Sequence, residues 1–368
     1  MVTGQTAQSA GMPDDAAVVG GLSHRAFFYS GERDYLAQIE AFARGGLENG
    51  EPVLIAVPGD KVGLLRERLG GRVRYADIAQ LGRNPARIIA ELREFIDAHP
   101  GQRVRFVGEP VWPGRSAAEM CEAARHEALI NLAFAGTAAT ILCPYDAAGL
   151  PPSVVSEAER THQALPGNGH QAAAVCYAGP GGVPPECDRP LPDPPATAET
   201  LSYETDLRAV RNIVASHARR AGLPDEQVAN LVLAASELAA NTLRHTSAGG
   251  TMHIWHTGEE ILCQIKDQGW ITDPLAGRTR RPPDERGHGL WVVNKVCDLV
   301  ERREFPIDEG MDRLCRAVTA EAPDAACASV MGAMVGADPA PDDIALLIFR
   351  REPLAAGNLA AGNVAVGN

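Results

Sequence analysis

A proline- and glycine-rich stretch divides this sequence into two parts, and it constrains the fold more than any other feature. From Pro166 to Pro195 the chain contains eight of its 27 prolines and several glycines. Prolines with a fixed φ and conformationally free glycines favour neither a helix nor a strand ladder, so we interpret this stretch as a linker or long irregular loop. The length of 368 residues fits two domains of ordinary size, one on each side of it.

The charge balance and the apolar runs indicate whether the protein can bind nucleic acid or a membrane. The chain has 34 Lys and Arg against 47 Asp and Glu, a net charge of −13, which argues against binding to nucleic acid. The segment from Met1 to Asp15 has no signal-peptide pattern, and the longest apolar stretch, Leu129 to Cys143, is interrupted and too short to span a bilayer. The eight cysteines form no C-x-x-C pair and lie mostly in apolar runs. We therefore expect reduced cysteines and a cytoplasmic protein without membrane contact.

The first part, residues 20–165, alternates strand and helix patterns. Three stretches are typical of buried strands: 53–58, 103–110 and 137–146. Three others have helical spacing: 34–47, 84–99 and 116–134. This alternation predicts an α/β domain with a parallel sheet covered by helices. The residues Pro58 to Lys61 lack the full phosphate-binding pattern of a P-loop, so we interpret them as a turn.

The same part resembles the MEDS sensory domain, which precedes regulatory domains in bacteria. The resemblance lies in five stretches: 23–36, 82–95, 105–115, 125–134 and 141–146. It implies a module that responds to a signal, expected to be a small molecule whose identity the sequence does not give. The polar or unusual residues in these stretches are His24, Glu109, Trp112, His126, Glu127, Cys143 and Asp146. For each of them we favour a structural role over ligand contact.

A long helix with a polar face is predicted at residues 225–246. Glu237, Asn241 and His245 repeat at i, i+4 and i+8, so they project from one side of this helix. An asparagine oxygen is a hard ligand that suits Mg²⁺, and a glutamate can orient or deprotonate an attacking hydroxyl. The helix face therefore predicts a magnesium-phosphate site.

Two glycine motifs follow this helix in the sequence. A predicted hairpin at 251–269 ends in the D-x-G motif of Asp267 and Gly269. Residues 287–300 open with a G-x-G motif and are expected to form a helix, whose N-terminus would offer free N–H groups to phosphate. The ordered set of E-x-x-x-N, D-x-G and G-x-G-L is far more specific than any one of its motifs.

This ordered set resembles the Bergerat ATP-binding fold of the GHKL superfamily, an α/β sandwich with a histidine-kinase-like ATPase architecture. The match is best to its anti-sigma-factor serine kinases and covers residues 201–300, after a linker at 166–200. The resemblance implies ATP and Mg²⁺ as cofactors, with Asn241 holding the metal, Glu237 as the catalytic base and Asp267 bonding the adenine amino group. The other nucleotide-binding residues would be His245, Gly269, Gly287, Gly289 and Leu290. Residues 271–286 would form an ATP lid, with Arg286 or His288 near phosphate.

The partners follow from the same resemblance. It implies a serine/threonine-protein kinase that phosphorylates an anti-anti-sigma antagonist protein, binds a sigma factor, regulates transcription and acts as a homodimer under control of the first domain. Two alternatives stay open: a non-catalytic, nucleotide-gated binding protein, and a sensor histidine kinase. His126 is the candidate acceptor of the histidine kinase, although its helix lacks the proline-terminated hairpin typical of an acceptor.

The end of the chain departs from the GHKL pattern. The usual closing strand does not follow the G-x-G helix at once. Residues 298–323 and 339–351 instead resemble the closing part of metal-dependent serine/threonine phosphatases of partner-switching pathways, where Asp342 and Asp343 would include a metal ligand. The earlier acidic motifs are absent, so we expect a truncated remnant at 301–352 without phosphatase activity.

The last apolar run has a different expected role. Residues 344–349 can supply a closing strand to the ATP-binding sheet. Residues 353–368 form a degenerate, uncharged repeat that predicts a disordered tail.

Overall fold

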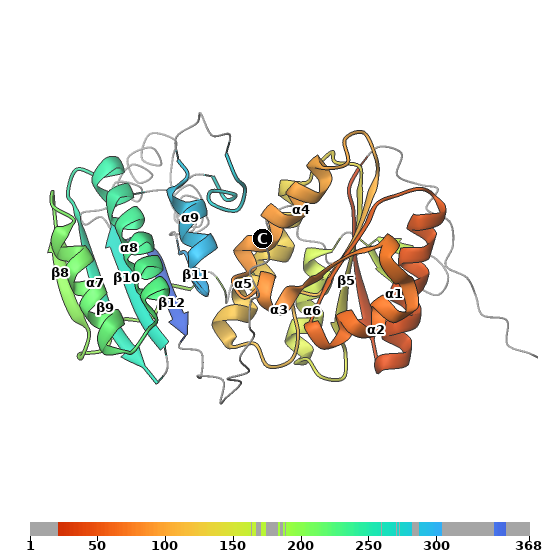
Figure 1. Cartoon of the computed structure of the whole chain (residues 1–368), viewed down its shortest axis with the longest axis horizontal. Helices are drawn as coiled ribbons and strands as arrows, with labels where there is room; N and C mark the ends of the chain where they lie inside the picture. Colours follow the sequence, from red (N-terminus) through yellow and green to blue (C-terminus); the bar gives the residue numbers. More distant parts are fainter. Residues whose placement is uncertain are drawn as a thin grey trace, which may run out of the picture.

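The chain folds into two α/β units that lie side by side, with α5 (Ala117–Ala133) and α9 (Gly289–Val296) between them (Figure 1). The computed structural model describes residues 21–162, 164–166, 171–173, 183–184, 187, 189–258, 260–269, 271, 273–281, 287–303 and 342–350. The predicted tail at 353–368 lies outside the described residues, as does most of the predicted phosphatase remnant.

The first unit is built on a seven-stranded sheet with the order β3-β2-β4-β5-β1-β6-β7. Neighbouring strands are parallel except for β6 and β7, which are antiparallel. The strands are β1 (Ser23–Tyr29), β2 (Val53–Val57), β3 (Arg74–Asp77), β4 (Val104–Gly108), β5 (Ala139–Asp146), β6 (Ala164–Pro166) and β7 (Gln171–Ala173). The predicted parallel α/β sheet is therefore confirmed.

Helices cover both faces of this sheet. The remaining elements are α1 (Glu32–Glu48), α2 (Gly59–Leu69), η1 (Gly70–Arg72), α3 (Ile78–Leu81), η2 (Pro85–Arg87), α4 (Ile88–Asp97) and α6 (Pro152–Thr161). On one face, Ile39 and Phe42 of α1 pack with Ile55 of β2. On the other face, helices α4, α5 and α6 cover Phe106 and Ile141. Helix α4 buries an apolar stripe, as the 3.6-residue period requires, whereas α5 also buries polar side chains such as Glu122 and Asn131.

Helix α5 has a well-defined start. The Ser116 hydroxyl accepts from the Glu119 N–H, and the Glu119 carboxylate accepts from the Ser116 N–H, which is a capping box. The cap fixes the position of a helix that contacts both units.

Two local predictions for the first unit are wrong. Pro58 precedes α2 and Gly59 begins it, so the segment interpreted as a turn is the first turn of a helix. The proline-rich stretch contains β7, and β6 ends at its first residue, so its start extends the sheet. Pairing with β1 and between these two short strands outweighs the local preference for irregular structure.

The second unit has a five-stranded antiparallel sheet with the order β11-β12-β10-β9-β8. Its elements are β8 (Glu199–Tyr203), α7 (Arg208–Arg220), α8 (Asp225–His245), β9 (Gly250–Thr257), β10 (Glu260–Asp267), α9, β11 (Leu299–Glu301) and β12 (Asp342–Arg350). The helices pack on one face of the sheet through a core that includes Val210, Leu231 and Ile265. The predicted long helix and the predicted hairpin are confirmed as α8 and β9–β10.

Strand β12 lies between β10 and β11 and bonds to both. It confirms the prediction that the apolar run at 344–349 supplies a strand to the sheet of the second unit. The helix expected at 287–300 is shorter than predicted, because it ends at Val296 and β11 begins at Leu299.

The remaining face of the second sheet is covered by chain that follows β7. Leu191 is buried there with Trp255, Leu262 and Leu299. Cys187, in the same stretch, forms a disulfide with Cys121 of α5. The expectation of reduced cysteines is therefore wrong for this pair, because the stretch folds back onto α5 and brings together two cysteines that are far apart in sequence.

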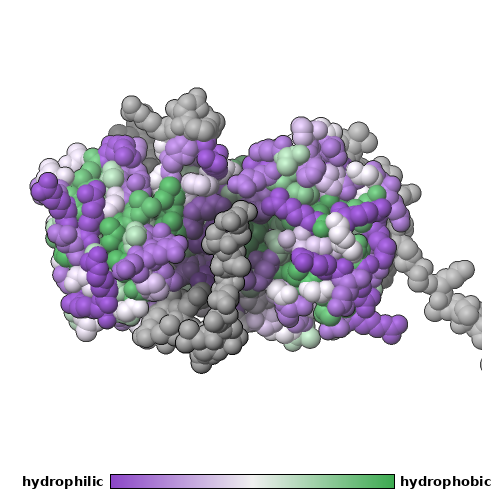
Figure 2. Space-filling view, in the orientation of Figure 1, coloured by the Kyte–Doolittle hydropathy of each residue, from purple (hydrophilic) through white to green (hydrophobic). Residues whose placement is uncertain are grey.

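Hydrophilic side chains cover most of the face shown in Figure 2, in both units. No helix in the described part of the chain has the length and apolarity needed to cross a membrane.

Candidate functional site

A cavity of about 520 Å³ lies in the first unit, and a larger one of about 950 Å³ lies in the second. The larger cavity is bounded by α8, the end of β10, the segment 271–281 and the N-terminus of α9. All eight sequence-predicted site residues line it: Glu237, Asn241, His245, Asp267, Gly269, Gly287, Gly289 and Leu290. The structure thus brings together residues spread over more than fifty positions of sequence.

Glu237 and Asn241 lie one turn apart on α8 and face the start of α9. A Cβ added at Gly289 would lie 2.8 Å from Glu237 Oε2 and 3.3 Å from Asn241 Nδ2. Only a glycine lets the N-terminus of α9 approach the two side chains this closely. The arrangement sets a carboxylate and a carboxamide beside the backbone N–H groups that open a helix, which suits a phosphate group and its cation.

Asp267 is held in place by donors on both of its oxygens. Oδ1 accepts from the Gly269 N–H at 2.6 Å, and Oδ2 accepts from the Thr242 hydroxyl. The Tyr203 hydroxyl donates to Thr242 in turn at 3.1 Å, and burial raises the pKa of Tyr203 to about 12. The carboxylate is 5% exposed and keeps acceptor capacity toward the cavity, as a group that recognises an amino donor requires.

Two glycines shape the lid side of the cavity. Gly287 has a φ of 104°, which L side chains rarely adopt. Gly277 has a φ of 77°, and a Cβ there would lie 2.7 Å from Leu290 Cβ. His288 lines the cavity, whereas Arg286 lies outside the described residues.

Thr242 and Arg244 are among the polar residues of this site that sequence reasoning missed. Thr242 follows Asn241 and is buried on the apolar side of α8. A polar residue among the apolar positions of the predicted helix was the signal that could have identified it. Arg244 donates to Asn241 Oδ1 at 2.8 Å and therefore occupies the oxygen that is predicted to bind metal. An amide oxygen has a second lone pair that can bind a metal, but the positive charge of this exposed arginine opposes a cation at the same oxygen.

The segment 273–281, which belongs to the predicted ATP lid, contacts the first unit through a buried ionic network. Glu122 of α5, which is 1% exposed, accepts from Arg278 at 3.1 Å and from Arg303 at 2.8 Å. Arg303 also pairs with Glu301 at 2.7 Å. Burial alone would raise the pKa of Glu122, but the positive charges of the nearby arginines hold it below its ordinary value. These ion pairs connect the two units.

The first unit also holds the C-terminal end of α9. Arg87 donates to the Asn294 carbonyl at 2.8 Å and to the Cys297 carbonyl at 2.6 Å. Asn84 donates to the same Asn294 carbonyl at 3.1 Å, and Arg83 pairs with Asp298 at 3.0 Å. Positive and donor groups at this end satisfy carbonyls that a helix leaves free. Both the lid and α9 are therefore anchored on the first unit.

Glu109, one of the polar residues selected in the first unit, has structural partners. Glu109 accepts from Lys61, Tyr29 and Tyr35, and burial raises its pKa. Lys61, the lysine after Gly59, is thus ion-paired inside the fold.

Trp112, Asp146 and His126 belong to the same selection, and the structure shows the surroundings of each. Trp112 stacks with the Arg115 guanidinium, whose carbon lies 3.6 Å from the ring centroid. Asp146 accepts from two backbone N–H groups of the following turn. His126 is 1% exposed, and burial lowers its pKa to about 3.

Together, the fold and the cavities define a two-domain protein with a parallel α/β unit and a nucleotide-binding α/β sandwich. Residues 23–163 match the family model described as the MEDS, methanogen/methylotroph DcmR sensory domain. Residues 201–312 match the family model described as the histidine kinase-like ATPase domain. No curated protein matches the chain. The chain carries a MEDS domain followed by a histidine kinase-like ATPase domain.

The residues around the cavity fit ATP and a magnesium ion. The cavity of about 950 Å³ that Glu237 and Asn241 line leaves room for a nucleotide with its phosphates. Asn241 supplies a hard oxygen donor, and Asp267 supplies an acceptor on another element of the cavity wall, strand β10. When bound, magnesium neutralises phosphate charge.

Proposed function

We propose that the chain is an ATP-dependent signalling regulator that phosphorylates a serine or threonine of an anti-anti-sigma antagonist protein. In this proposal it acts in the cytoplasm as a homodimer and also binds a sigma factor. The observation that carries the proposal is the position of Glu237, one helical turn from Asn241 and facing the N-terminus of α9. A carboxylate at this place can accept the proton of an attacking hydroxyl.

Each predicted residue has a role in the proposal. Asn241 holds magnesium, Asp267 accepts from the adenine amino group, and Gly287 and Gly289 keep the phosphate cradle open. Leu290 and Gly269 form walls of the cavity, and His245 lies at its rim. The histidine kinase-like ATPase match supports ATP binding.

Control by the MEDS domain rests on the contacts between the units. Glu122 holds Arg278 of the lid, and Arg87 holds the end of α9. A small-molecule signal that moves α5 together with the adjoining η2 would therefore shift both the lid and α9, whose N-terminus opens the phosphate cradle.

A non-catalytic, nucleotide-gated binding protein is the second candidate. Arg244 on Asn241 Oδ1 favours it, since this contact competes with metal binding. The histidine-kinase alternative finds less support, because His126 is buried within α5 and is out of reach of a phosphate donor.

Incubation of the purified chain with Mg-ATP and an antagonist protein encoded beside its gene tests the proposal. The Glu237→Gln variant should bind ATP within a few-fold of wild type and transfer phosphate about 10²- to 10⁴-fold more slowly. Glu226→Gln, an exposed glutamate at the start of the same helix, is the matched control and should behave as wild type.

Three outcomes would contradict parts of the proposal. Transfer by Glu237→Gln at the wild-type rate would refute the role of this carboxylate. ATP binding without transfer by wild type would favour the nucleotide-gated alternative. Absence of ATP binding would refute both the kinase function and the nucleotide-gated binding function.

A further inference from the structure

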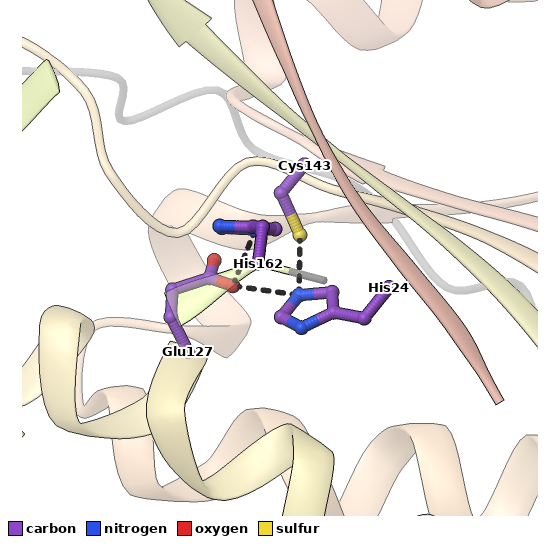
Figure 3. A group of neighbouring side chains, drawn as sticks. All are labelled: His24, Glu127, Cys143 and His162. Carbon is purple, nitrogen blue, oxygen red and sulfur yellow. Dashed lines mark hydrogen bonds and ion pairs between the residues drawn. The ribbon is translucent and has the colours of Figure 1, made fainter. Parts of the chain in front are cut away.

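Four titratable side chains from separate elements meet in the core of the MEDS domain, on the side of its sheet that α5 and α6 cover. They form a buried cluster: His24, Glu127, Cys143 and His162 (Figure 3). Each is at most 1% exposed. One potential ligand atom from each lies within 4.8 Å of all the others. The proposed kinase site, in the other domain, makes no use of them.

The fold explains how these residues meet. Strands β1 and β5 are parallel neighbours, with Ala26 opposite Cys143, so His24 and Cys143 point to the same face. Glu127 comes from α5, and His162 directly follows α6. Two strands and two helices thus converge on one point.

Hydrogen bonds fix the outer nitrogen of His24. Asn131 Nδ2 donates to the Thr161 carbonyl at 2.7 Å, so Asn131 Oδ1 faces His24 Nδ1 at 3.1 Å. An amide oxygen only accepts, and therefore His24 Nδ1 carries a hydrogen. In the neutral ring, the inner nitrogen Nε2 is then a lone-pair acceptor.

The outer nitrogen of His162 is fixed in the same way. Its Nδ1 lies 2.7 Å from the Ala158 carbonyl, which only accepts, so this nitrogen also carries a hydrogen. A hydrogen bond from the outer nitrogen to a carbonyl or amide oxygen is typical of histidines that bind metal.

Apart from the weak donor of the Cys143 thiol, the inner atoms of the cluster consequently lack donors. His24 Nε2 lies 3.0 Å from Glu127 Oε2 and 3.3 Å from Cys143 Sγ. His162 Nε2 lies 3.3 Å from the same carboxylate oxygen and has no hydrogen-bond partner, although it is fully buried. Two imidazole lone pairs and a carboxylate facing one another in a dry core require a positive centre.

We propose that the buried cluster binds a divalent transition-metal ion, and that Zn²⁺ is the ion that fits it best. Two neutral imidazoles, one thiolate and one carboxylate carry a charge of −2 together, which a divalent ion balances. The set of two nitrogens, one sulfur and one oxygen is typical of four-coordinate zinc and differs from the all-oxygen shells of Ca²⁺ and Mg²⁺.

The spacing of the atoms suits this ion. Zinc bonds of about 2.0–2.3 Å in a tetrahedral arrangement hold ligand atoms about 3.3–3.6 Å apart. Three of the six separations, 3.0, 3.3 and 3.3 Å, need adjustments of only a few tenths of an ångström. All six lie within 4.8 Å, so the atoms farthest apart must approach one another by up to about an ångström to share the ion. Glu127 also lines the adjacent cavity of about 520 Å³, which gives the ion an access path.

Metal analysis and cobalt substitution of the full chain test this proposal. Thiol reductants are left out, because they bind zinc and would reduce the bond between Cys121 and Cys187. We expect stoichiometric zinc in the purified protein. After chelation, added Co²⁺ should give the visible bands of a tetrahedral ion and a near-ultraviolet band from thiolate-to-cobalt charge transfer.

Matched cysteine variants assign the sulfur ligand. Cys143→Ser should lose the charge-transfer band, whereas Cys263→Ser, which removes a buried free thiol of the ATPase domain, should keep it. Asn131→Ala should keep the band and weaken metal affinity about 10- to 100-fold, because Asn131 orients His24 without binding the ion. If Cys143→Ser does not fold, the weaker metal affinity expected for Asn131→Ala tests the proposal in its place.

Two results would overturn the proposal. A chain with no bound metal and no cobalt spectrum would show that a proton, and not a metal ion, occupies the cluster. A charge-transfer band that survives in Cys143→Ser would show that the ion binds elsewhere. The outcome is independent of phosphate transfer, since ATP is absent from the assay.

Discussion

Removing the charge of Glu122 should release the ATP lid from the MEDS domain. The substitution Glu122→Gln keeps the size of the side chain but leaves Arg278 and Arg303 without this anion. Arg303 still has Glu301 at 2.7 Å, so the loss falls mainly on Arg278. Burial already lowers the pKa of Arg278 to about 10, which shows how poorly its site accommodates an unpaired positive charge.

The size of the effect follows from the burial of the pair. Glu122 is 1% exposed and the Arg278 side chain 8%, so solvent screens their interaction little. Breaking a buried ion pair by removing one partner costs about 3–5 kcal/mol. The molecule can avoid this cost by letting the segment 273–281 move into water. Since about 1.4 kcal/mol corresponds to a factor of ten, local opening of the lid should become about 10²- to 10⁴-fold more frequent.

Amide hydrogen exchange of the lid, followed by mass spectrometry, measures this opening directly. Glu94→Gln is the control, since it removes an equal charge from an exposed position on α4 of the same domain. Lid exchange in Glu122→Gln that equals the control would refute the reasoning and would mean that the network does not couple the two domains.

Three other predictions concern the same domains. Ending the chain at residue 320 removes β12 and should lower both the thermal stability and the ATP affinity, whereas ending it at residue 352 should change neither, as calorimetry can show. Asp267→Asn should weaken ATP binding about 10-fold or more in titration calorimetry, because a side-chain amide cannot accept on both sides as the carboxylate does; unchanged affinity would remove Asp267 from the site. Because the pKa of Glu122 in the fold lies below its ordinary value, its stabilising contribution is complete above the unfolded pKa of about 4.3 and is lost as the pH falls through the folded value; the protection of the lid amides, taken relative to their intrinsic exchange rates at each pH, should therefore fall only below about pH 4 in wild type and should lack this step in Glu122→Gln.

The elements with a strong local period were predictable from the sequence. The apolar stripe of α8 and the polar spacing of Glu237, Asn241 and His245 fixed one wall of the cavity. The glycines that precede and open α9 supplied the facing wall. These patterns depend on neighbours within one or two turns, which a single sequence displays.

The contacts between distant segments were not predictable in the same way. Glu122 and Arg278 are 156 positions apart, and neither residue carries a motif. Three members of the buried cluster were noted as unusual residues, but His162 follows a helix that no pattern announced. Their meeting depends on the order of the strands and on the path of α6, which a local period does not encode.

The place of β12 in its sheet also affects the order in which the protein can mature on the ribosome. Its neighbours, β10 and β11, are complete once residue 301 has been made, yet β12 ends only at Arg350. At about 5–20 residues per second, synthesis of the intervening chain takes about 2–10 seconds. During that time one edge of β10 has no partner strand, and open edges of this kind favour pairing with other chains. The ATPase domain is therefore more prone to aggregate during its own synthesis than a domain whose neighbouring strands are close together in the sequence.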